Sequence, residues 1–432
     1  MQKKLTPLDR AQLHYRILAW ITACAFYFYQ FLLQVVPSVL KPEIQSQFNL
    51  SAQGFGAIAA FLLYAYAAMQ IPVGLLLDRY GPRRILPYAA LLCAFGSLLF
   101  GMATTYQAAI LGRFLTGIGG AFAVIGCFKV AAMEFEARHF SMLTGLTVMI
   151  GMSGAAFGQA LLGPVLHKMP HWQDVFYILF FVGVGIAGLM VLLLPNHSAH
   201  PVEEVKSTKQ LKDELILVLK NPCTWVAAFY AGLMYTPTLA LGEAWGIAFL
   251  VEAIGLSREA AHQIVPTLFI GWAIGSFVFG FLTEFIERSW LMISSSFCVA
   301  LIYRMIAEPN FALTDVSMWT FLFFILGLTS AGFILAFTSA KEANHESMAA
   351  TASGVMNTMN TLCGAIAQQL IGFLLDQRLA NPQATTSVLH NYQKAFSCIE
   401  YALWISVFLS IVLMMMEKPN PFDEKSHPST SK

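Results

Sequence analysis

The sequence predicts an all-α membrane protein in which twelve transmembrane helices form two pseudo-symmetric six-helix bundles. Composition gives the first reason: 57% of the 432 residues are hydrophobic, 11% are charged, and the mean hydropathy is +0.64. Soluble proteins carry about 25% charged residues, so most of this surface must face lipid. Long apolar runs and an internal repeat give the other two reasons. The composition excludes a soluble enzyme, a disordered chain and a coiled coil.

Apolar runs long enough to cross a bilayer follow one another along the chain. A spanning helix needs about 20 mostly apolar residues, and helices satisfy their own backbone inside lipid. Ser51 and Ser257 stand where the N-caps of two helices would fall. The expected helices are 17–38, 52–77, 85–104, 107–130, 141–166, 174–194, 223–249, 262–285, 290–308, 316–340, 349–375 and 395–416.

The distribution of positive charge between the loops predicts that both termini lie in the cytoplasm. In this orientation 17 of the 25 lysines and arginines fall in interior loops and five in exterior loops. Such a bias is typical of cytoplasmic loops. The net charge of +1 gives no reason to expect a nucleic-acid partner.

A polar stretch near the middle of the chain divides the helices into six and six. We expect an N-terminal bundle at 1–195, a cytoplasmic linker at 196–222, a C-terminal bundle at 223–416 and a cytoplasmic tail at 417–432. The seven cysteines occur singly and without metal-ligand spacing, so we expect no disulfide framework, no metal and no cofactor.

The two halves repeat each other in three helices. Gly74 and Asp78 match Gly280 and Glu284 at a constant offset. In the same order along the chain, Gly117 matches Gly327 and Gln159 matches Gln368. Three matches with nearly the same offset indicate a duplicated six-helix unit. Two such units enclose a path on a pseudo-two-fold axis, and rocking one against the other would expose that path to each side in turn.

Two motifs in this repeat resemble those of the major facilitator superfamily. The stretch from Gly74 to Arg84, GLLLDRYGPRR, resembles the superfamily signature between helices two and three. The stretch from Arg113 to Gly120, RFLTGIGG, resembles its helix-four motif. The wider phrase AYAAMQIPVGLLLDRYGPRR is most similar to the branch of phagosomal nutrient transporters of intracellular bacteria. The resemblance covers about residues 17–416 and implies an amino-acid importer of the bacterial inner membrane.

The first motif also implies a conformational latch. Asp78 lies at the inner end of helix two, where a carboxylate can accept hydrogen bonds from the N-terminus of a neighbouring helix. The alternative is simple positive-inside anchoring by the arginines. The expected latch residues are Gly74, Asp78, Arg79, Gly81, Arg83 and Arg84, with a degraded second copy at Glu284 and Arg288.

Three charged residues fall inside expected helices and are candidates for substrate or proton binding. A charge at membrane depth is costly unless it faces a cavity or a partner. By the resemblance, Arg113 lines a central cavity. Glu243 is either a proton acceptor or a partner for a substrate amine, and an outer-end residue in water is the alternative. Lys129 could contact a substrate carboxylate or extend to the cytoplasm.

Polar side chains share one face in each of two helices, which predicts a polar cavity. Such groups either bind a polar ligand or join helices together. The candidates are Tyr27, Gln30 and Gln34 in helix one and Asn357, Asn360, Thr361 and Gln368 in helix eleven. Trp245 could line the site or belong to an aromatic belt at the membrane surface. Candidates of second rank are Tyr64, Tyr66, Gln159 and Tyr235.

These residues lead to a functional hypothesis. The sequence contains neither a nucleotide phosphate loop nor a catalytic motif, so we expect a gradient-driven transporter and no enzyme. We expect a monomer in the bilayer that imports a small zwitterion, such as an amino acid or short peptide, together with protons. Arg113 would bind its carboxylate and Glu243 its ammonium. The alternatives are an organic acid, a siderophore or an exported drug as cargo, and a membrane sensor that transports nothing.

Overall fold

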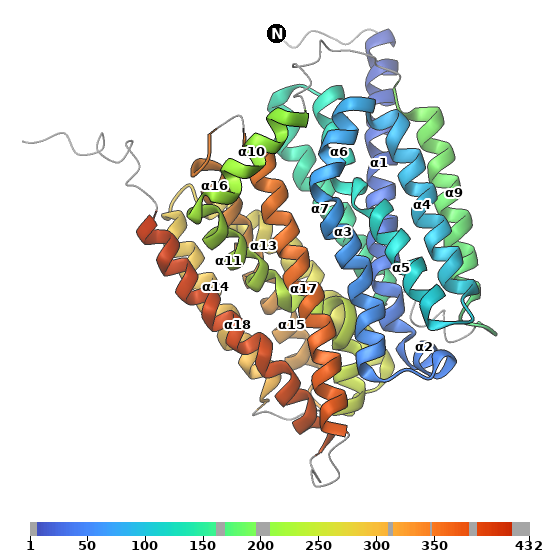
Figure 1. Ribbon diagram of the computed structural model, residues 1–432, viewed down its shortest axis with the longest axis vertical. Helices are drawn as coiled ribbons and strands as arrows, with labels where there is room; N and C mark the ends of the chain where they lie inside the picture. The colour runs from blue at the N-terminus through green and yellow to red at the C-terminus, as the bar shows by residue number, and fades with distance from the viewer. Residues whose placement is uncertain are drawn as a thin grey trace, which may run out of the picture.

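The computed structural model describes residues 7–160, 169–195, 208–309, 314–345, 348–379 and 387–416, and within these ranges every regular element is a helix (Figure 1). This confirms the predicted all-α fold class. The expected domain boundaries at 195/196 and 416/417 lie next to residues outside these ranges, so these boundaries stay predictions.

The first half of the chain supplies six long helical stretches and one short helix. Ser51 accepts a hydrogen bond from Gly54 N and so caps α3, as expected. Gly81, at a φ of 76°, ends α3 and allows Pro82 to begin α4 at once. The elements are α1 (Pro7–Val39), α2 (Lys41–Phe48), α3 (Ala52–Tyr80), α4 (Pro82–Met102), α5 (Tyr106–Gly120), α6 (Phe122–Glu134), α7 (Ala137–Ala160) and α9 (Asp174–Leu193).

The second half follows the same plan, with more broken helices. Ser257 caps α13 through Ala260 N, as expected. The elements are α10 (Thr208–Lys220), α11 (Pro222–Pro237), η1 (Thr238–Trp245), α12 (Gly246–Ala248), η2 (Phe249–Ala253), α13 (Arg258–Leu282), α14 (Arg288–Ala307), α15 (Val316–Ser330), η3 (Ala331–Ile334), α16 (Leu335–Glu342), α17 (Ala349–Leu379) and α18 (Val388–Met416).

Eleven of the twelve expected spans meet a test of length and hydropathy in the described part of the chain. Ten do so as single stretches. The eleventh is 222–253, which meets the test only together with the end of α10, and the two pieces meet at a bend of 77°. The remaining position belongs to α7, which is 24 residues long but rich in glycine, serine and threonine. The expected end of that helix, 161–166, lies outside the described residues.

The packing of the helices repeats between the halves. Gly117 on α5 lies directly against the backbone carbonyl of Leu62 on α3, and Gly327 on α15 lies in the same way against Leu268 on α13. Because these pairs are related by the sequence repeat, the close approach confirms the duplication. Across the interface α3 packs against α17 and α13 against α7, which is the same contact seen from each half.

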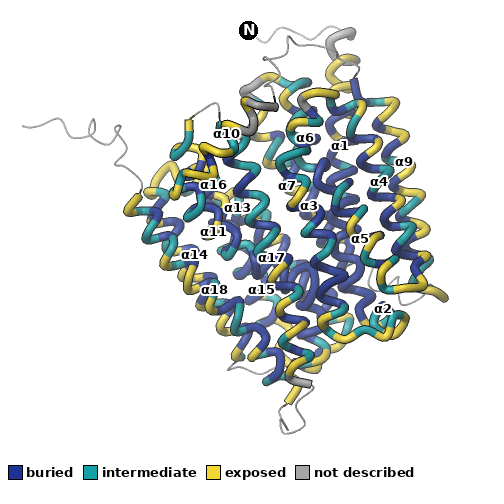
Figure 2. The backbone as a smooth tube through the Cα atoms, in the orientation of Figure 1, coloured by how far each residue is buried: buried dark blue, intermediate teal, exposed yellow. Residues whose placement is uncertain are grey.

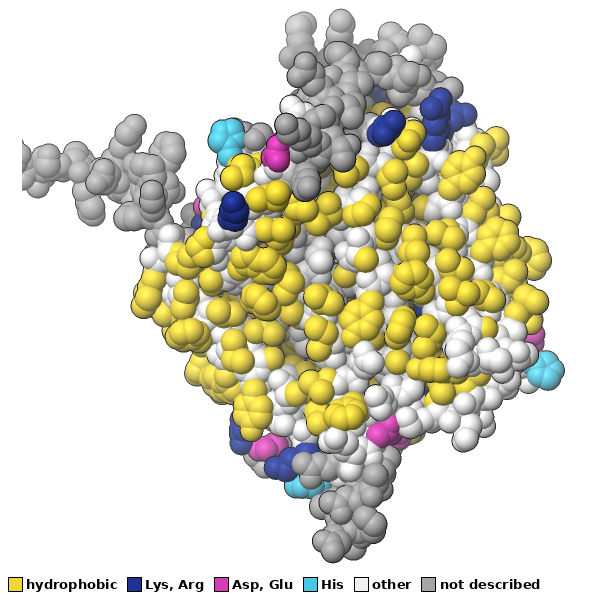
Figure 3. Space-filling view, in the orientation of Figure 1, with side chains coloured by type: hydrophobic (Ala, Val, Ile, Leu, Met, Phe, Trp, Pro, Cys, Tyr) yellow, Lys and Arg dark blue, Asp and Glu magenta, His cyan; other side chains and the backbone are white. Residues whose placement is uncertain are grey.

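The molecule has two ends, which we call the linker end and the distal end. At the linker end α1 begins, α18 ends and α10 lies across the bundle; at the distal end lies α2 (Figure 1). On the face shown in Figure 3, hydrophobic side chains cover the surface between these ends, whereas charged side chains gather near the two rims. Buried residues are concentrated inside each half and where the halves meet (Figure 2).

Part of the expected linker is a packed helix rather than a solvated strand of chain. Helix α10 is amphipathic, and it buries Val218 against Ala352 and Val355 at the start of α17. Its apolar positions recur at helical spacing, which explains why a segment rich in lysine folds onto the bundle.

Candidate functional site

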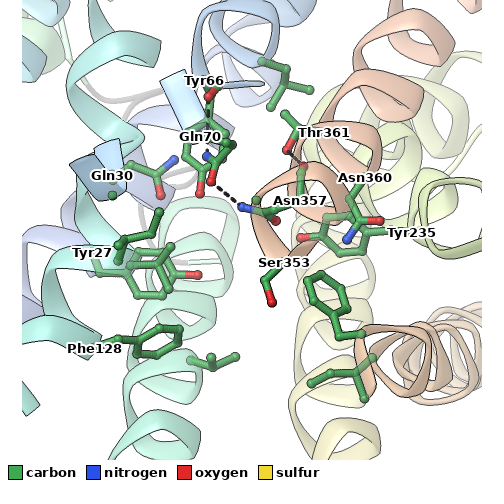
Figure 4. Close-up of a pocket in the computed structure, with 18 of the residues that line it drawn as sticks. Tyr27, Gln30, Tyr66, Gln70, Phe128, Tyr235, Ser353, Asn357, Asn360 and Thr361 are labelled. Carbon is green, nitrogen blue, oxygen red and sulfur yellow. Dashed lines mark hydrogen bonds between the residues drawn. The ribbon is translucent and has the colours of Figure 1, made fainter. Parts of the chain in front are cut away.

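A cavity of about 650 Å³ lies between the two halves. Helices α1, α3 and α6 line one wall, and α11, α13 and α17 line the other (Figure 4). Leu215 of α10, Gly74 and Thr351 line it near the linker end, so the cavity extends from mid-membrane toward that end. Among the described residues that line it, none carries a charged side chain.

Eight of the candidate substrate-binding or proton-binding residues line this cavity. The polar groups therefore come from both halves, as the shared helix faces predicted. Asn357 Nδ2 donates a hydrogen bond to Gln70 Oε1 at 2.7 Å and joins the walls across the interface (Figure 4). The eight are Tyr27, Gln30, Gln34, Tyr66, Tyr235, Asn357, Asn360 and Thr361.

Glu243 is buried behind the cavity wall, in contact with Gln34. Gln34 Nε2 donates to Glu243 Oε2 at 2.6 Å, and Gln30 Nε2 donates to Gln34 Oε1. Glu243 Oε1 has no hydrogen-bond partner in the described part of the chain. A chain of two amides thus links the carboxylate to the cavity, because both glutamines line it.

The segment that carries Glu243 is an unusual π-helix. Turns of this kind are rare and occur frequently at functional sites. Gln159 of α7 donates to the carbonyl of Gly242, and Gln368 of α17 donates to that of Leu239 at 2.8 Å. These two glutamines are the repeat-related pair, and each satisfies a carbonyl of η1 (Thr238–Trp245). They hold the helix that carries Glu243 and do not line the cavity.

Arg113 also lies outside the cavity wall. Its guanidinium donates to three backbone carbonyls: Leu33 at 2.7 Å, Gln34 at 3.2 Å and Ile58 at 3.3 Å. These bonds tie α5 to α1 and α3 and satisfy a buried cation. Gln34 therefore contacts Arg113 through its backbone and Glu243 through its side chain, and stands between the two charges.

Contacts between the halves close the distal end, and we call these contacts the distal seal. Lys41 Nζ lies 2.8 Å from Glu252 Oε1 and 5.1 Å from the ring centre of Trp245, and Arg258 lies 3.4 Å from Glu43. Lys41 is 4% exposed, and its burial lowers the pKa of the ammonium although the Glu252 carboxylate opposes that shift.

Asp376 strengthens the same seal from α17. Its carboxylate accepts hydrogen bonds from Ala52 N at 2.9 Å and Gln53 N at 2.8 Å, which are the first two amides of α3. An acidic group is stabilising at a helix N-terminus. Gly372 permits this approach, since a Cβ there would lie 2.5 Å from the carbonyl oxygen of Ala52.

Two other predicted residues are also absent from the cavity lining. Trp245 is buried in the seal, where its Nε1 donates to Gln368 O at 3.0 Å and its ring meets Phe55 edge-on. Lys129 lies half-buried on α6, next to Phe128, which does line the cavity.

Three of the latch residues make contacts within their own half. Arg83 donates to Leu194 O at 2.8 Å, Arg79 lies over Tyr80, and Arg288 pairs with Glu342 at 2.7 Å. Arg84 and Glu284 are exposed. The side chain of Asp78 lies outside the described part of the structure. A Cβ at Gly74 would meet no atom within 4 Å, so the space beside this glycine is empty at the linker end.

Sequence reasoning missed several residues of the site and its seal. Gln70, Trp272 and Phe333 line the cavity, and Lys41 and Asp376 hold the distal end. Gln70 stands four residues after Tyr66 on α3, a helical spacing that could have indicated a shared face.

Comparison with known proteins decides the family. The model of the Major Facilitator Superfamily matches residues 19–368. The chain belongs to this superfamily. As a member it is a multi-pass membrane transporter, and the fold, the repeat and the central cavity agree with that membership.

Two relatives of this superfamily member carry organic acids according to their names. The chain is 24% identical to the probable sulfoacetate transporter of Cupriavidus necator over 82% of this chain and 86% of the relative. It is 23% identical to the probable L-galactonate transporter of Escherichia coli over 78% of each. Among solved structures, an inward-facing, unoccupied bacterial homolog of the human lysosomal transporter Spinster has the same fold, with a TM-score of 0.74 and 17% identity over 94% of this chain and 99% of that one.

Proposed function

We propose that this protein is a secondary transporter that moves a small hydroxylated organic acid across a membrane by alternating access. One observation carries the proposal: an uncharged, mainly apolar cavity that presents amide and hydroxyl groups, between two repeated halves that are sealed together at the distal end. Alternation needs the distal seal to open and the linker end to close as one half rocks against the other.

The positive charge near the linker end supports a cytoplasmic location for that end. Arg79, Arg83 and Arg84 all lie there, and cytoplasmic loops are enriched in such residues. With this orientation, in a bacterial inner membrane, the structure represents the state in which cargo exchanges with the cytoplasm.

The two relatives favour an organic acid over an amino acid as cargo, and the described lining holds no acidic side chain to pair with a substrate ammonium. A zwitterion would need Arg113 and Glu243 to face it together. Instead, Arg113 is bound to three carbonyls and Glu243 lies behind Gln34. The wall offers amides, hydroxyls and aromatic rings, which suit hydroxyl groups and a carbon chain. Branch membership among phagosomal amino-acid importers stays a prediction.

Glu243 is the group we assign to proton coupling. Burying a carboxylate without a paired cation is costly, and a bound proton removes that cost. Its contact with Gln34 crosses from the second half to the first, so it must break when the distal end opens. Opening would thereby expose the carboxylate to protons on the distal side.

Uptake into proteoliposomes tests the proposal. The labelled solutes are D-galactonate, D-gluconate, lactate, glucose and alanine, each with and without an inward proton gradient. We expect uptake of one or more hydroxy acids, raised by the gradient, and no uptake of alanine. Uptake of alanine without any hydroxy acid would overturn the proposed cargo and restore the zwitterion hypothesis.

A further inference from the structure

The wall that the second half contributes carries two buried polar atoms that lack a partner. Trp272 is 4% exposed and Asn360 is 2% exposed, and both line the cavity. Trp272 Nε1 and Asn360 Oδ1 have no hydrogen-bond partner among the described residues. Leaving a buried donor or acceptor unpaired is unfavourable, so such atoms mark positions where a ligand group would be favourable.

The two atoms border one aromatic surface. Tyr235 and Phe333 stack with ring centres 5.0 Å apart and an angle of 21° between their planes. Trp272 packs against both, at 5.9 Å from Tyr235 and 5.7 Å from Phe333. Asn360 lies beside Tyr235 on the same side of the cavity (Figure 4). The wall therefore combines an apolar surface with one donor and one acceptor at its edge.

We infer that this wall is a hydroxyl-binding subsite, which we define as Tyr235, Trp272, Phe333 and Asn360. The inference rests on the proposed function and names the part of the cargo that this wall binds. An indole N–H can only donate and an amide oxygen can only accept. A hydroxyl group does both, so the hydroxyl groups of a cargo can pair with either atom. The aromatic surface then packs against the carbon chain that bears them.

The charged groups of a cargo fit this subsite less well. A carboxylate accepts from Trp272 but offers Asn360 Oδ1 no proton, and an ammonium donates to Asn360 but repels the indole N–H. The subsite therefore binds the hydroxylated part of the cargo, and the acidic group lies elsewhere in the cavity. A site built to pair with a hydroxyl rejects the analogue that lacks it, because its own polar groups stay unpaired.

Competition between matched acids tests the subsite. Purified full-length protein in proteoliposomes takes up whichever labelled hydroxy acid the uptake panel identifies. Unlabelled competitors are that acid and its deoxy analogues, each lacking one hydroxyl. We expect at least one deoxy analogue to compete about tenfold less well, which corresponds to about 1.4 kcal/mol.

Two substitutions localise the effect. Trp272→Phe keeps the ring and removes the donor, and we expect it to raise KM for the hydroxy acid about tenfold and to abolish the preference over the deoxy analogue. Asn360→Leu removes the acceptor with the same expected result, whereas Asn360→Gln keeps an uncharged amide oxygen and should retain the preference. Trp290→Phe, on a residue that is exposed on α14, controls for tryptophan loss.

The outcomes separate this inference from the proposed function. If no hydroxy acid is taken up, the proposed function fails. If a hydroxy acid is taken up but its deoxy analogues compete equally well, the subsite is overturned and the proposed function stands. The same holds if the preference survives in both Trp272→Phe and Asn360→Leu. Size-exclusion profiles and uptake at saturating cargo show whether either variant has folded.

Discussion

Gln34 donates a 2.6 Å hydrogen bond to Glu243 across the interface between the two halves. This bond joins the buried carboxylate to the cavity, since Gln34 lines the cavity and receives a second hydrogen bond from Gln30. Its position on the interface means that rocking the halves apart at the distal end separates the two side chains. The contact therefore depends both on the protonation of Glu243 and on whether the distal seal is open or closed.

Replacing Glu243 with glutamine should uncouple transport from the proton gradient. The amide keeps the size of the side chain but cannot release or bind a proton at neutral pH. We expect uptake of the hydroxy acid to lose its dependence on the gradient, while exchange of labelled for unlabelled cargo continues. Glu308→Gln, on an exposed residue that pairs with Arg304, is the matched control and should keep the dependence. Full gradient dependence in Glu243→Gln would remove Glu243 from the coupling role.

Removing the carboxylate of Asp376 should weaken the distal seal. A helix cap contributes about 1 kcal/mol, so Asp376→Ala should shift the equilibrium toward an open distal end about fivefold. The readout is the labelling rate, from the distal side, of a cysteine at Ala60, which is buried with Leu239 and Ala365 where the halves meet. Asp315→Ala removes a cap within its own half, on α15, and should leave that rate unchanged. Equal rates in both variants would contradict the role of Asp376.

Much of the fold could be predicted from the sequence because lipid imposes long apolar helices. The repeat could be predicted for a different reason, which is close helix packing. A glycine at a close helix contact, such as Gly117 or Gly327, tolerates no larger residue in this packing. Shared helix faces also identified six residues of the cavity wall. Each of these signals is local, so periodicity and spacing can reveal it.

Contacts between distant segments were beyond such reasoning. Lys41 looked like an ordinary loop lysine, yet it is buried against Glu252. Asp376 caps a helix that begins more than 300 positions earlier in the chain. Glu243 and Arg113 were recognised as charges at membrane depth, but their depth does not reveal whether they face the cavity or the helices behind it. The π-helix at Thr238–Trp245 depends on partners from two other helices, which periodicity does not show.

The buried ammonium of Lys41 should make the distal seal depend on pH. Burial lowers the pKa of Lys41 in the closed seal, whereas opening would hydrate the ammonium and return its pKa toward the ordinary value near 10.5. The closed seal then binds fewer protons than the open one, so raising the pH should favour closure, between the lowered pKa and about 10.5. The labelling rate of a cysteine at Ala60, divided by the rate of a model thiol at the same pH, should fall as the pH rises through that range. Lys41→Met should abolish the effect, and an unchanged pH profile in that variant would contradict the assignment.

Filling the space beside Gly74 should block closure of the linker end. The structure leaves this space empty, whereas closure would bring the start of α17 toward the end of α3. We expect Gly74→Trp to fold and to bind cargo but to lose at least nine tenths of its uptake, because the indole holds the halves apart. The comparison is Gly185→Trp, at an open position on α9 that is not part of the cavity lining, which should transport normally. Normal uptake by Gly74→Trp would show that this glycine does not meet α17.

The central claim is that cargo crosses only when the distal seal opens. It is tested most directly by locking the seal. In a background without the native cysteines, Glu43 and Arg258, which pair across the seal at 3.4 Å, are replaced by cysteines and joined with a short, reducible bis-methanethiosulfonate reagent. The account predicts that uptake of the hydroxy acid into proteoliposomes stops on cross-linking and returns after reduction. Uptake by the fully cross-linked protein at the rate of the reduced protein would contradict it.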